Sequence, residues 1–407
     1  MLSASFAFRR AIAQNTKTLL KATLTLADGT TRELAGDDLM MSSASFTDSV
    51  SSAGSFDIGA AIIGRMALSL NNCDGRFDDY DFEGSEVVPY VGVRIDDDTV
   101  EWLRKGVYGV EQPETYGNVI GVDALDNMRR LEVPYSEVPT TYPATLGTIA
   151  RDICDHCGVT LATPAFANSS FVVEGRPDDS SLTCIAALAF VAQASGNWAR
   201  CDEWGRVRLD WYDTSSYEGE GWLDGDRFDE ASPYASGDTA NGGDFVTYGG
   251  GDSVDGGGFS LRPWAHVFAI ANFSVATDDV VITGVRVTAQ DGEGDQDGET
   301  ALYGAEGYVL DLPDNPLVQH GTAQAVAAQV GARVVGMRFR PFDISALADP
   351  TLEAGDPIII TDAKQRQYRS YVTTLTYKVG SMRPSRATRR ALAGTRRPRT
   401  ARSRRQS

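Results

Sequence analysis

The chain has 407 residues, of which 42% are hydrophobic, and a formal net charge of −19. This size and composition predict about two to four folded domains and exclude a mainly disordered chain. No stretch approaches the roughly 20 apolar residues that a membrane-spanning helix needs, and Arg9, Arg10 and Lys17 interrupt the apolar residues of the N-terminus. We therefore expect a soluble protein made in the cytoplasm without a cleaved signal.

The charge is divided unevenly along the chain. Residues 383–407 hold ten Arg and no acidic residue, so this tail contributes +10 to the total of −19 and the remaining chain carries −29. An acidic body repels nucleic-acid phosphates, which argues against DNA or RNA as its main ligand. We expect the Arg-rich tail to be disordered, either solvated or resting on a neighbouring acidic subunit. Binding of nucleic acid or of an anionic cell-surface polymer by the tail stays open.

Strand signals dominate residues 1–134. An amphipathic stretch to about Leu20 precedes an alternating run from Ala22, in which Asp28 and Gly29 predict a tight hairpin turn. Short apolar runs between residues 56 and 70 are punctuated by glycines, a pattern typical of a twisted sheet or barrel. We predict one N-terminal β domain.

The segment 101–128 contains a hairpin followed by a helix start. Residues 107–110 and 119–122 are β-rich, and the turn residues 113–117 separate them. Asp123 and Asp126 are candidate caps for a helix with one apolar side. That side would comprise Leu125, Met128 and Leu131.

Residues 135–213 form a small inserted α+β unit in this interpretation. Apolar residues from 145 to 157 have helical spacing and end at Gly158, and an Ala- and Leu-rich helix is predicted from about 182 to 195. A hairpin over 198–211 follows.

The remainder is predicted to be a linker and a second β domain. Nine of the 23 residues from Ser236 to Gly258 are Gly, so 214–258 reads as a linker or a long surface loop. The C-terminal β domain, residues 259–382, has strand patterns at 264–275, 280–288, 356–362 and 368–379 and a helix from about 322 to 335. In the second of these strands Val281, Thr283, Val285 and Val287 would share one face. The fold class is therefore β-rich α+β.

The sequence predicts no catalytic or cofactor-binding residue. Only His156, His266 and His320 could serve a His-dependent enzyme, and none lies in a recognisable nucleophile motif. Phosphate-cradling, dinucleotide-binding and zinc-protease motifs are missing as well. Hydrolysis by a pair of carboxylates stays open, since 56 acidic residues offer many pairs. We expect a protein that is not an enzyme.

Two cysteine pairs and two acidic segments are candidate metal sites. Cys154 and Cys157 have zinc-ligand spacing, and Cys184 and Cys201 could complete four thiolates. Cys184 and Cys201 are far apart in the sequence, whereas a zinc site usually has a second close pair. Cys154 and Cys157 lie on the apolar side of their predicted helix, which favours buried, unligated thiols. The segments 71–81 and 291–299 are dense in acids.

Neither acidic segment is a complete calcium loop. Counting from Glu293 puts Gly298 correctly at the sixth position, but Gly304 stands where a bidentate Glu is needed. An acidic solvated loop is favoured there, and a turn at Asp74 and Gly75. We predict no metal site.

The order of several segments resembles a known family. A Trp, a Gly-x-Tyr strand, a turn Pro and Ala-Leu-Asp-Asn-Met within residues 101–128 resemble the N-terminal hub domain of phage tail-tip proteins. Residues 55–77 resemble its first β domain, residues 145–211 its helix, helix and hairpin insertion, and residues 312–317 and 349–360 its closing β domain. The resemblance spans about residues 6–380.

The resemblance implies a fold and an assembly. Members of the family resemble the central hub of contractile-phage baseplates and the N-terminal part of siphophage tail-associated proteins. Two β-barrel-like hub domains per subunit would form a pseudo-sixfold ring in a homotrimer, which joins the tail tube to the tip and lets DNA pass without specific binding. The implied partners are the distal tail protein, the tape-measure protein and other tail-tip proteins, and the implied location is the tail tip of a virion assembled in the host cytoplasm.

A second function stays open. A cell-wall hydrolase or a carbohydrate-binding tail protein would use carboxylate pairs or the six Trp and 15 Tyr residues. The aromatic residues are dispersed, which favours packing. The chain also ends soon after the second β domain, so we expect no lytic or receptor-binding module.

Overall fold

The computed structural model describes four stretches of the chain. These are residues 1–212, 265–290, 299–379 and 385–387, apart from residues 14–16, 41, 53–55, 112, 114–116, 347–348, 363 and 365. The expected linker 214–258, most of the Arg-rich tail and residues 291–298 of the candidate calcium loop lie outside the described residues.

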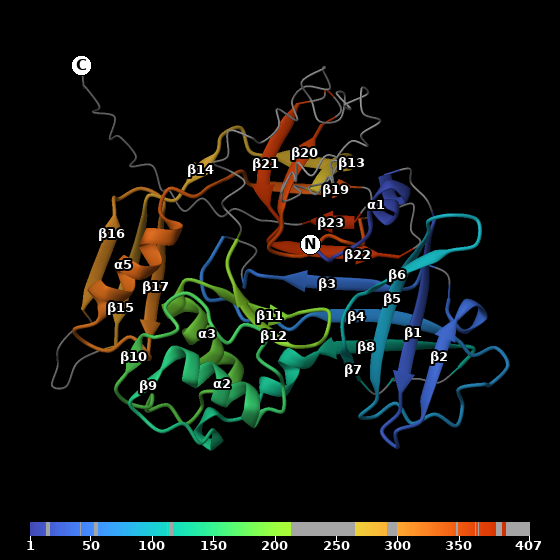
Figure 1. The fold of residues 1–407 in the computed structure, drawn as a ribbon, viewed down its shortest axis with the longest axis horizontal. Helices are drawn as coiled ribbons and strands as arrows, with labels where there is room; N and C mark the ends of the chain where they lie inside the picture. The colour runs from blue at the N-terminus through green and yellow to red at the C-terminus, as the bar shows by residue number, and fades with distance from the viewer. Residues whose placement is uncertain are drawn as a thin grey trace, which may run out of the picture.

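The described chain is β-rich α+β, as the sequence predicts, and its largest element is one sheet of 14 strands. The N-terminal half of this sheet has the order β2-β1-β5-β7-β8-β4-β3, with β6 on β5 (Figure 1). All pairings in this half are antiparallel. Its strands are β1 (Thr18–Thr25), β2 (Thr31–Ala35), β3 (Ser45–Ser49), β4 (Arg65–Asn71), β5 (Glu86–Arg94), β6 (Val100–Arg104), β7 (Tyr108–Val110) and β8 (Val119–Asp126).

The C-terminal half continues the sheet as β22-β23-β19-β13-β20-β21. Its strands are β13 (Ala265–Val275), β19 (Phe342–Ala346), β20 (Pro357–Thr361), β21 (Gln367–Tyr371), β22 (Thr374–Lys378) and β23 (Ser385–Ala387). The β13–β20 pairing is parallel, and the others are antiparallel. Among the described residues the strand order ends openly at β2 and β21, and no pairing closes a barrel.

The two halves meet at β3 and β22, which lie side by side at the centre of Figure 1. Five residue pairs form this antiparallel seam, from Thr374 opposite Ser49 to Lys378 opposite Ser45. Across it, the Ser49 and Thr374 hydroxyls are 2.8 Å apart. The backbone ladder thus makes one sheet of segments more than 300 residues apart in the chain.

The predicted helices of the 135–213 region are confirmed. They are α2 (Leu146–His156) and α3 (Cys184–Ser195). Thr145 caps α2 by accepting from the Thr148 backbone N–H at 3.1 Å, and α3 ends at Gly196, whose φ of +67° suits glycine. The predicted hairpin is β11 (Trp198–Cys201) and β12 (Val207–Asp210), and a two-stranded sheet joins β9 (Ala144–Thr145) to β10 (Val172–Val173).

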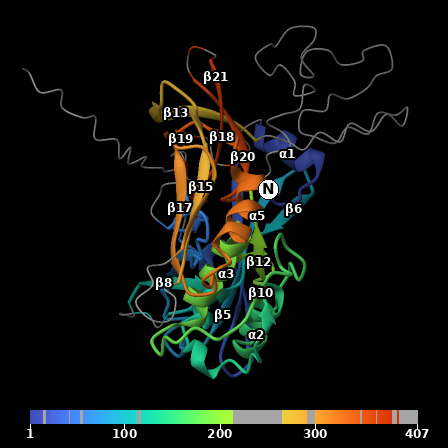
Figure 2. The ribbon, with the colours of Figure 1, turned by 90° about the vertical axis from the view of Figure 1, so that its left-hand side faces the viewer.

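A small mixed sheet with one helix lies beside this region. It comprises β15 (Gly284–Ala289), β16 (Thr300–Gly304) and β17 (Val309–Asn315), with α5 (Ala323–Val334) against it (Figures 1 and 2). The predicted helix is confirmed, but the single strand predicted over 280–288 is wrong. It is divided into β14 (Val280–Val281), which pairs with β18 (Arg338–Phe339), and β15. Ile282 between them is fully buried and exchanges backbone hydrogen bonds with Gly336 and Met337, which connect α5 to β18.

The end of the 101–128 segment differs from the prediction. Leu125 and Asp123 belong to β8, which stays extended because it pairs with the whole of β4. A 3₁₀ turn, η2 (Asn127–Leu131), follows in place of an α-helix, and its cap is Asp126, which accepts from the Met128 N–H at 3.0 Å. The remaining short elements are α1 (Phe6–Ala13), η1 (Gly36–Asp38) and η3 (Tyr135–Glu137).

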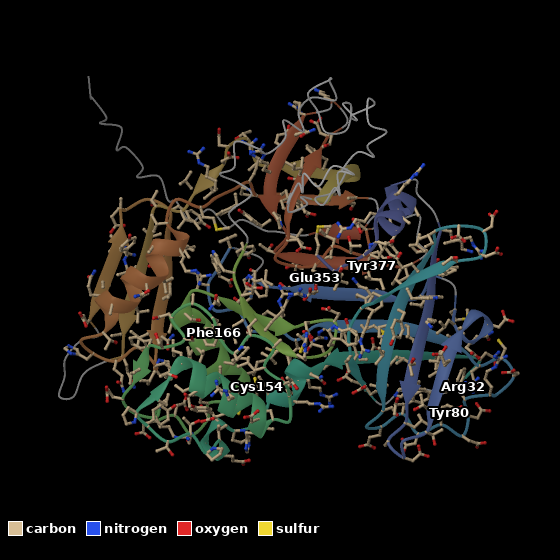
Figure 3. The ribbon with its side chains drawn as sticks, viewed as in Figure 1. Arg32, Tyr80, Cys154, Phe166, Glu353 and Tyr377 are labelled. Carbon is tan, nitrogen blue, oxygen red and sulfur yellow. The ribbon has the colours of Figure 1, made fainter. Side chains whose placement is uncertain are left out.

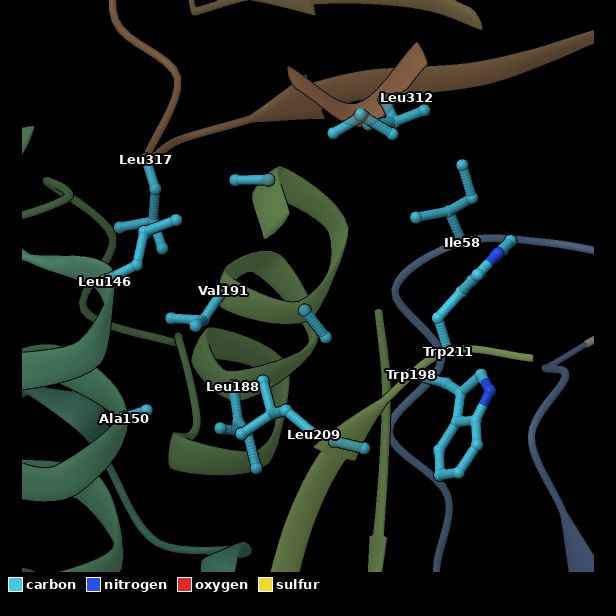
Figure 4. Packing of buried hydrophobic residues seen from close by; sticks show 14 of the residues in the cluster. Ile58, Leu146, Ala150, Leu188, Val191, Trp198, Leu209, Trp211, Leu312 and Leu317 are labelled. Atoms are coloured by element: carbon cyan, nitrogen blue, oxygen red, sulfur yellow. The ribbon is translucent and has the colours of Figure 1, made fainter. Parts of the chain in front are cut away.

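The largest hydrophobic core crosses the expected domain boundaries. It packs α2 and α3 against the hairpin β11–β12 and against buried residues of the small sheet and α5 (Figure 4). Separate clusters fill the N-terminal half of the sheet and the C-terminal half. No described helix is long and apolar enough to cross a membrane.

Candidate functional site

A cavity of about 50 Å³ lies where both halves of the large sheet meet the hairpin β11–β12. Five of the ionisable residues in its lining are what we call the charged junction: Asp48, Lys105, Asp126, Arg200 and Glu353. Glu353 and Tyr377, which also lines the cavity, lie near the centre of the molecule (Figure 3).

Arg200 is the centre of the charged junction. It projects from β11 with only 5% of its side chain exposed. One terminal nitrogen, Nη1, donates to Asp48 of β3, and the other, Nη2, donates to Glu353 Oε1 at 2.5 Å. The guanidinium therefore ties the hairpin to both halves of the large sheet. Burial opposes its charge, but the two carboxylates raise its pKa further above the ordinary range, so it stays protonated.

The two carboxylates bound to Arg200 respond differently. Burial raises the pKa of Asp48, against the attraction of Arg200, and Asp48 Oδ2 also accepts from the Ala354 N–H at 3.3 Å. Burial would raise the pKa of Glu353 too, but Arg200 and the α-amino group of Met1, 3.4 Å from Glu353 Oε2, hold it below the usual range. Glu353 is thus the carboxyl of the pair whose ionised form the surroundings favour.

Asp126 serves the backbone rather than a counter-charge. Its Oδ2 accepts from the Gly64 N–H at 2.9 Å, and its Oδ1 accepts from the Met128 N–H. Burial nevertheless raises its pKa to about 7, because two peptide donors only partly replace the lost water.

Lys105 is the second cation of the charged junction. Its Nζ donates to the Pro350 carbonyl at 2.7 Å and lies 5.5 Å from the centre of the Tyr377 ring. Burial lowers its pKa, while Glu353 and Asp48 act in the opposite direction.

The geometry suits a structural joint. Ligand pockets usually measure about 300–1,000 Å³, far more than this cavity. The carboxylates of Asp48, Asp126 and Glu353 already accept hydrogen bonds from the protein itself. What the arrangement can do is hold three parts of the chain in one relative position.

The four candidate zinc ligands are only partly brought together. Cys154 and Cys157 lie at the end of α2, close to Cys184 at the start of α3, while Cys201 belongs to the cavity lining (Figure 3 labels Cys154). All four are free thiols. Within the described residues no group of three or more His, Cys, Asp or Glu could hold a metal ion.

The other candidates are scattered. His156 is at the end of α2, His266 in β13 and His320 before α5, so the three histidines belong to different segments of the fold. In the acidic segment 71–81 the backbone turns at Gly75, whose φ is +74°, and the side-chain hydrogen bonds of Arg76 hold the pKa of Asp74 at about 2.

No short-range sequence signal identifies the charged junction. Arg200 lies 152 and 153 residues from its two carboxylate partners. A buried strand residue that is charged is unusual, but the strand pattern around Arg200 does not reveal which residues pair with it.

Comparisons with known proteins give structural likenesses only. No family model and no curated protein matches the chain. The solved structures that resemble it include the 43 kDa tail protein of prophage MuSo2 from Shewanella oneidensis (10% identity, TM-score 0.47, 91% of this chain and 98% of that one), a tail protein from Neisseria meningitidis (9%, 0.48, 91% and 94%) and prophage tail protein gp18 from Listeria monocytogenes (7%, 0.47, 90% and 93%). All three of these structures are of tail proteins.

Proposed function

We propose that this chain is a structural component of a phage or prophage tail tip and is not an enzyme. The observation that carries the proposal is the β3–β22 seam, which makes the two β-rich halves one continuous sheet. A hub that joins two rings needs such a rigid body with large surfaces. The order of the tail-tip segments in the sequence supports the same role.

The proposed assembly is a homotrimeric baseplate hub. In each subunit the N-terminal and C-terminal β halves would act as two barrel-like hub domains, so that three subunits present six similar units to a sixfold tail tube. The expected partners are the distal tail protein, the tape-measure protein and other tail-tip proteins.

The proposed ring would line the DNA exit channel. The chain has a net charge of −19, and its Arg-rich tail contributes +10, so the remaining body carries −29. Such an acidic body repels phosphates and lets DNA slide through without binding. This requires Asp and Glu residues on the inner face of the ring, and a basic lumen would contradict it.

The decisive experiment measures the assembly of the purified full-length chain. Native mass spectrometry should give three copies, and electron microscopy of the same sample should give threefold rings with six peripheral units. A monomer at all accessible concentrations would overturn the hub proposal. Zymography on bacterial cell walls tests the competing lytic function, and a clear lytic band would replace the structural role.

A further inference from the structure

Side chains of three neighbouring strands and of a hairpin turn form an aromatic and basic surface on the N-terminal half. We call it the Trp204 face and define it by five residues: Lys21 of β1, Tyr90 of β5, Trp102 and Arg104 of β6, and Trp204 of the turn between β11 and β12.

The strand register places the first four of these side chains together. Lys21 lies opposite Tyr90, and Tyr90 lies opposite Arg104, so all three are on one side of the sheet. Trp102 precedes Arg104 by two residues and is therefore on the same side. Its ring covers Gly92, where an added Cβ would lie 2.7 Å from the ring.

Contacts between cations and rings hold the Trp204 face in one arrangement. Lys21 Nζ lies 5.0 Å from the centre of the Trp102 ring and 5.3 Å from that of the Tyr90 ring. The Arg104 guanidinium lies 4.6 Å from the centre of the Trp204 ring, and its Nε donates to the Glu203 carbonyl at 2.9 Å. Among the described residues neither Lys21 nor Arg104 has a carboxylate partner. Both positive charges are therefore available to a binding partner.

The Trp204 ring gives this surface the character of a binding site. It is 55% exposed, more than any other large hydrophobic side chain of the described residues. Trp, Tyr and Arg are the residue types that dominate the binding energy of protein interfaces. Because stacking already orders these side chains, little further conformational entropy is lost when a partner covers them.

The chain also exposes a surface of the opposite charge, at the edge of the same half. Residues 71–83 contain five Asp or Glu residues and one Arg. We define the acidic patch by five exposed residues: Asp37, Met40, Asp74, Asp79 and Val119. The Asn71 side chain donates to the Asp37 carbonyl at 2.9 Å, and Val119 lies opposite Asn71. Arg32 and Tyr80, which Figure 3 labels, lie at this edge.

The acidic patch can make apolar contacts as well as ionic ones. Met40 is 38% exposed and Val119 is 44% exposed, so two of its members are large hydrophobic side chains in contact with solvent. A partner that is both basic and aromatic suits such a surface, since it can bind the carboxylates and cover the apolar side chains.

We propose that the Trp204 face of one copy of this chain binds the acidic patch of the next copy. The proposal rests on the homotrimer proposed above. A ring of three identical subunits needs a heterologous contact, in which two different patches of one surface meet. The body outside the tail carries −29, from the total of −19 and the +10 of the tail, so copies repel each other except where opposite charges meet. The Arg-rich tail has the same sign as the Trp204 face and is excluded as its occupant.

Native mass spectrometry of the purified full-length chain over a range of concentrations tests the contact. Trp204→Ala should raise the concentration at which half of the chains are trimeric by at least about tenfold. Lys21→Glu combined with Arg104→Glu should give monomers, because both surfaces are then acidic. The matched control is Arg338→Glu combined with Lys378→Glu, which reverses two exposed cations elsewhere and should leave the trimer intact.

A charge exchange separates binding from a loss of folding. Asp37→Lys combined with Asp79→Lys should also give monomers, because both surfaces are then basic. The chain that carries all four reversals regains opposite charges on the two surfaces and should form trimers again. Residues that only support the fold would give no such recovery.

The failure of this contact can be told apart from the failure of the hub proposal. A wild-type trimer that withstands reversal of the Trp204 face overturns the contact and leaves the hub proposal intact, whereas a wild-type monomer at all concentrations overturns both. Single-stranded DNA and bacterial cell walls are the competing occupants. If either retains the wild type but not the reversed face, and the reversed chain is still trimeric, the face belongs to an anionic polymer and the proposal is wrong.

Discussion

Arg200 holds a buried charge that Asp48 and Glu353 bind directly. Replacing it with Met deprives the partly exposed Asp48 and the buried Glu353 of the guanidinium that they share, and breaking a buried ion pair costs about 3–5 kcal/mol. We therefore expect Arg200→Met to lower the free energy of unfolding in urea by that amount. Arg286→Met, which removes an exposed guanidinium from Glu306 and Asp311, should cause a much smaller loss.

A compensated variant tests the cause of that loss. If unpaired charge is responsible, Asp48→Leu and Glu353→Met in the Arg200→Met background should recover much of the stability, because well-packed apolar residues can replace a buried ion cluster. Equal losses for Arg200→Met and Arg286→Met would contradict the central role of the charged junction.

The raised pKa of Asp126 predicts that its contribution to the free energy of unfolding depends on pH with the opposite sign to that of a salt-bridged carboxylate. Its folded pKa, about 7, lies above the ordinary value of about 4, so the folded state retains a proton that the unfolded state releases. Its contribution to stability is therefore complete below about pH 4 and is lost as the pH rises through about 7. The charges that act on Asp126 are Asp48, which raises its pKa, and Arg200, which lowers it. Asp126 in turn raises the pKa of Tyr108 and Cys201.

Comparison with Asp126→Asn isolates this contribution. The amide cannot titrate and retains only one acceptor atom for the Gly64 and Met128 N–H groups, so the variant should be less stable than the wild type near pH 4. Urea unfolding at several pH values should show this deficit shrinking towards pH 8, by at most about 4 kcal/mol. A deficit that is constant with pH would show that Asp126 does not titrate in this range.

The hairpin β11–β12 depends on a glycine in its turn. Gly205 has a φ of +73°, and a Cβ there would lie 2.6 Å from Asn127 Nδ2 and 2.9 Å from Val107 Cβ. Gly205→Ala combines left-handed strain with a clash against the N-terminal half of the sheet. Gly158→Ala is the matched control, because Gly158 has a φ of +67° and nothing lies within 4 Å of the added Cβ. Its only cost is left-handed backbone strain, about 1–2 kcal/mol.

We expect Gly205→Ala to destabilise the protein more than Gly158→Ala does. The clash also displaces Asn127, whose Nδ2 donates to the Gly205 carbonyl at 2.8 Å, and so loosens the docking of the hairpin that carries Arg200. Chemical denaturation of both variants measures the difference. Equal losses would mean that the turn can move away from Val107 at no cost.

Local sequence signals predicted the helices but not the contacts between distant strands. In α2 and α3, apolar spacing, a Thr cap and a terminal Gly all agree, so local preference decides the outcome. In β8, Asp123 and Leu125 have helix-start character, yet pairing with β4 keeps them extended. The charged junction needs residues more than 150 positions apart to meet, and hydrophobic periodicity contains no information about such a meeting.

At the scale of the whole molecule, three features connect the parts of the chain. The β3–β22 seam joins the two β halves, the largest core is shared between α2, α3, the small sheet and α5, and the charged junction ties the hairpin to both halves. Parts that share a sheet and a core lose each other's contacts when one unfolds. The described chain should therefore unfold as one cooperative unit.

Two core variants in distant places test this cooperativity. Leu70 is fully buried in the N-terminal cluster, and Val330 is fully buried in α5. Each truncation to Ala removes apolar contacts and leaves a cavity, with a cost of about 2–5 kcal/mol for the Leu and less for the smaller Val. In a cooperative molecule each should move the entire heat-absorption peak to lower temperature, with calorimetric and van't Hoff enthalpies remaining equal. Independent units would instead split the peak, with Leu70→Ala moving one part and Val330→Ala the other, and the rigid body required of a hub would then be lost.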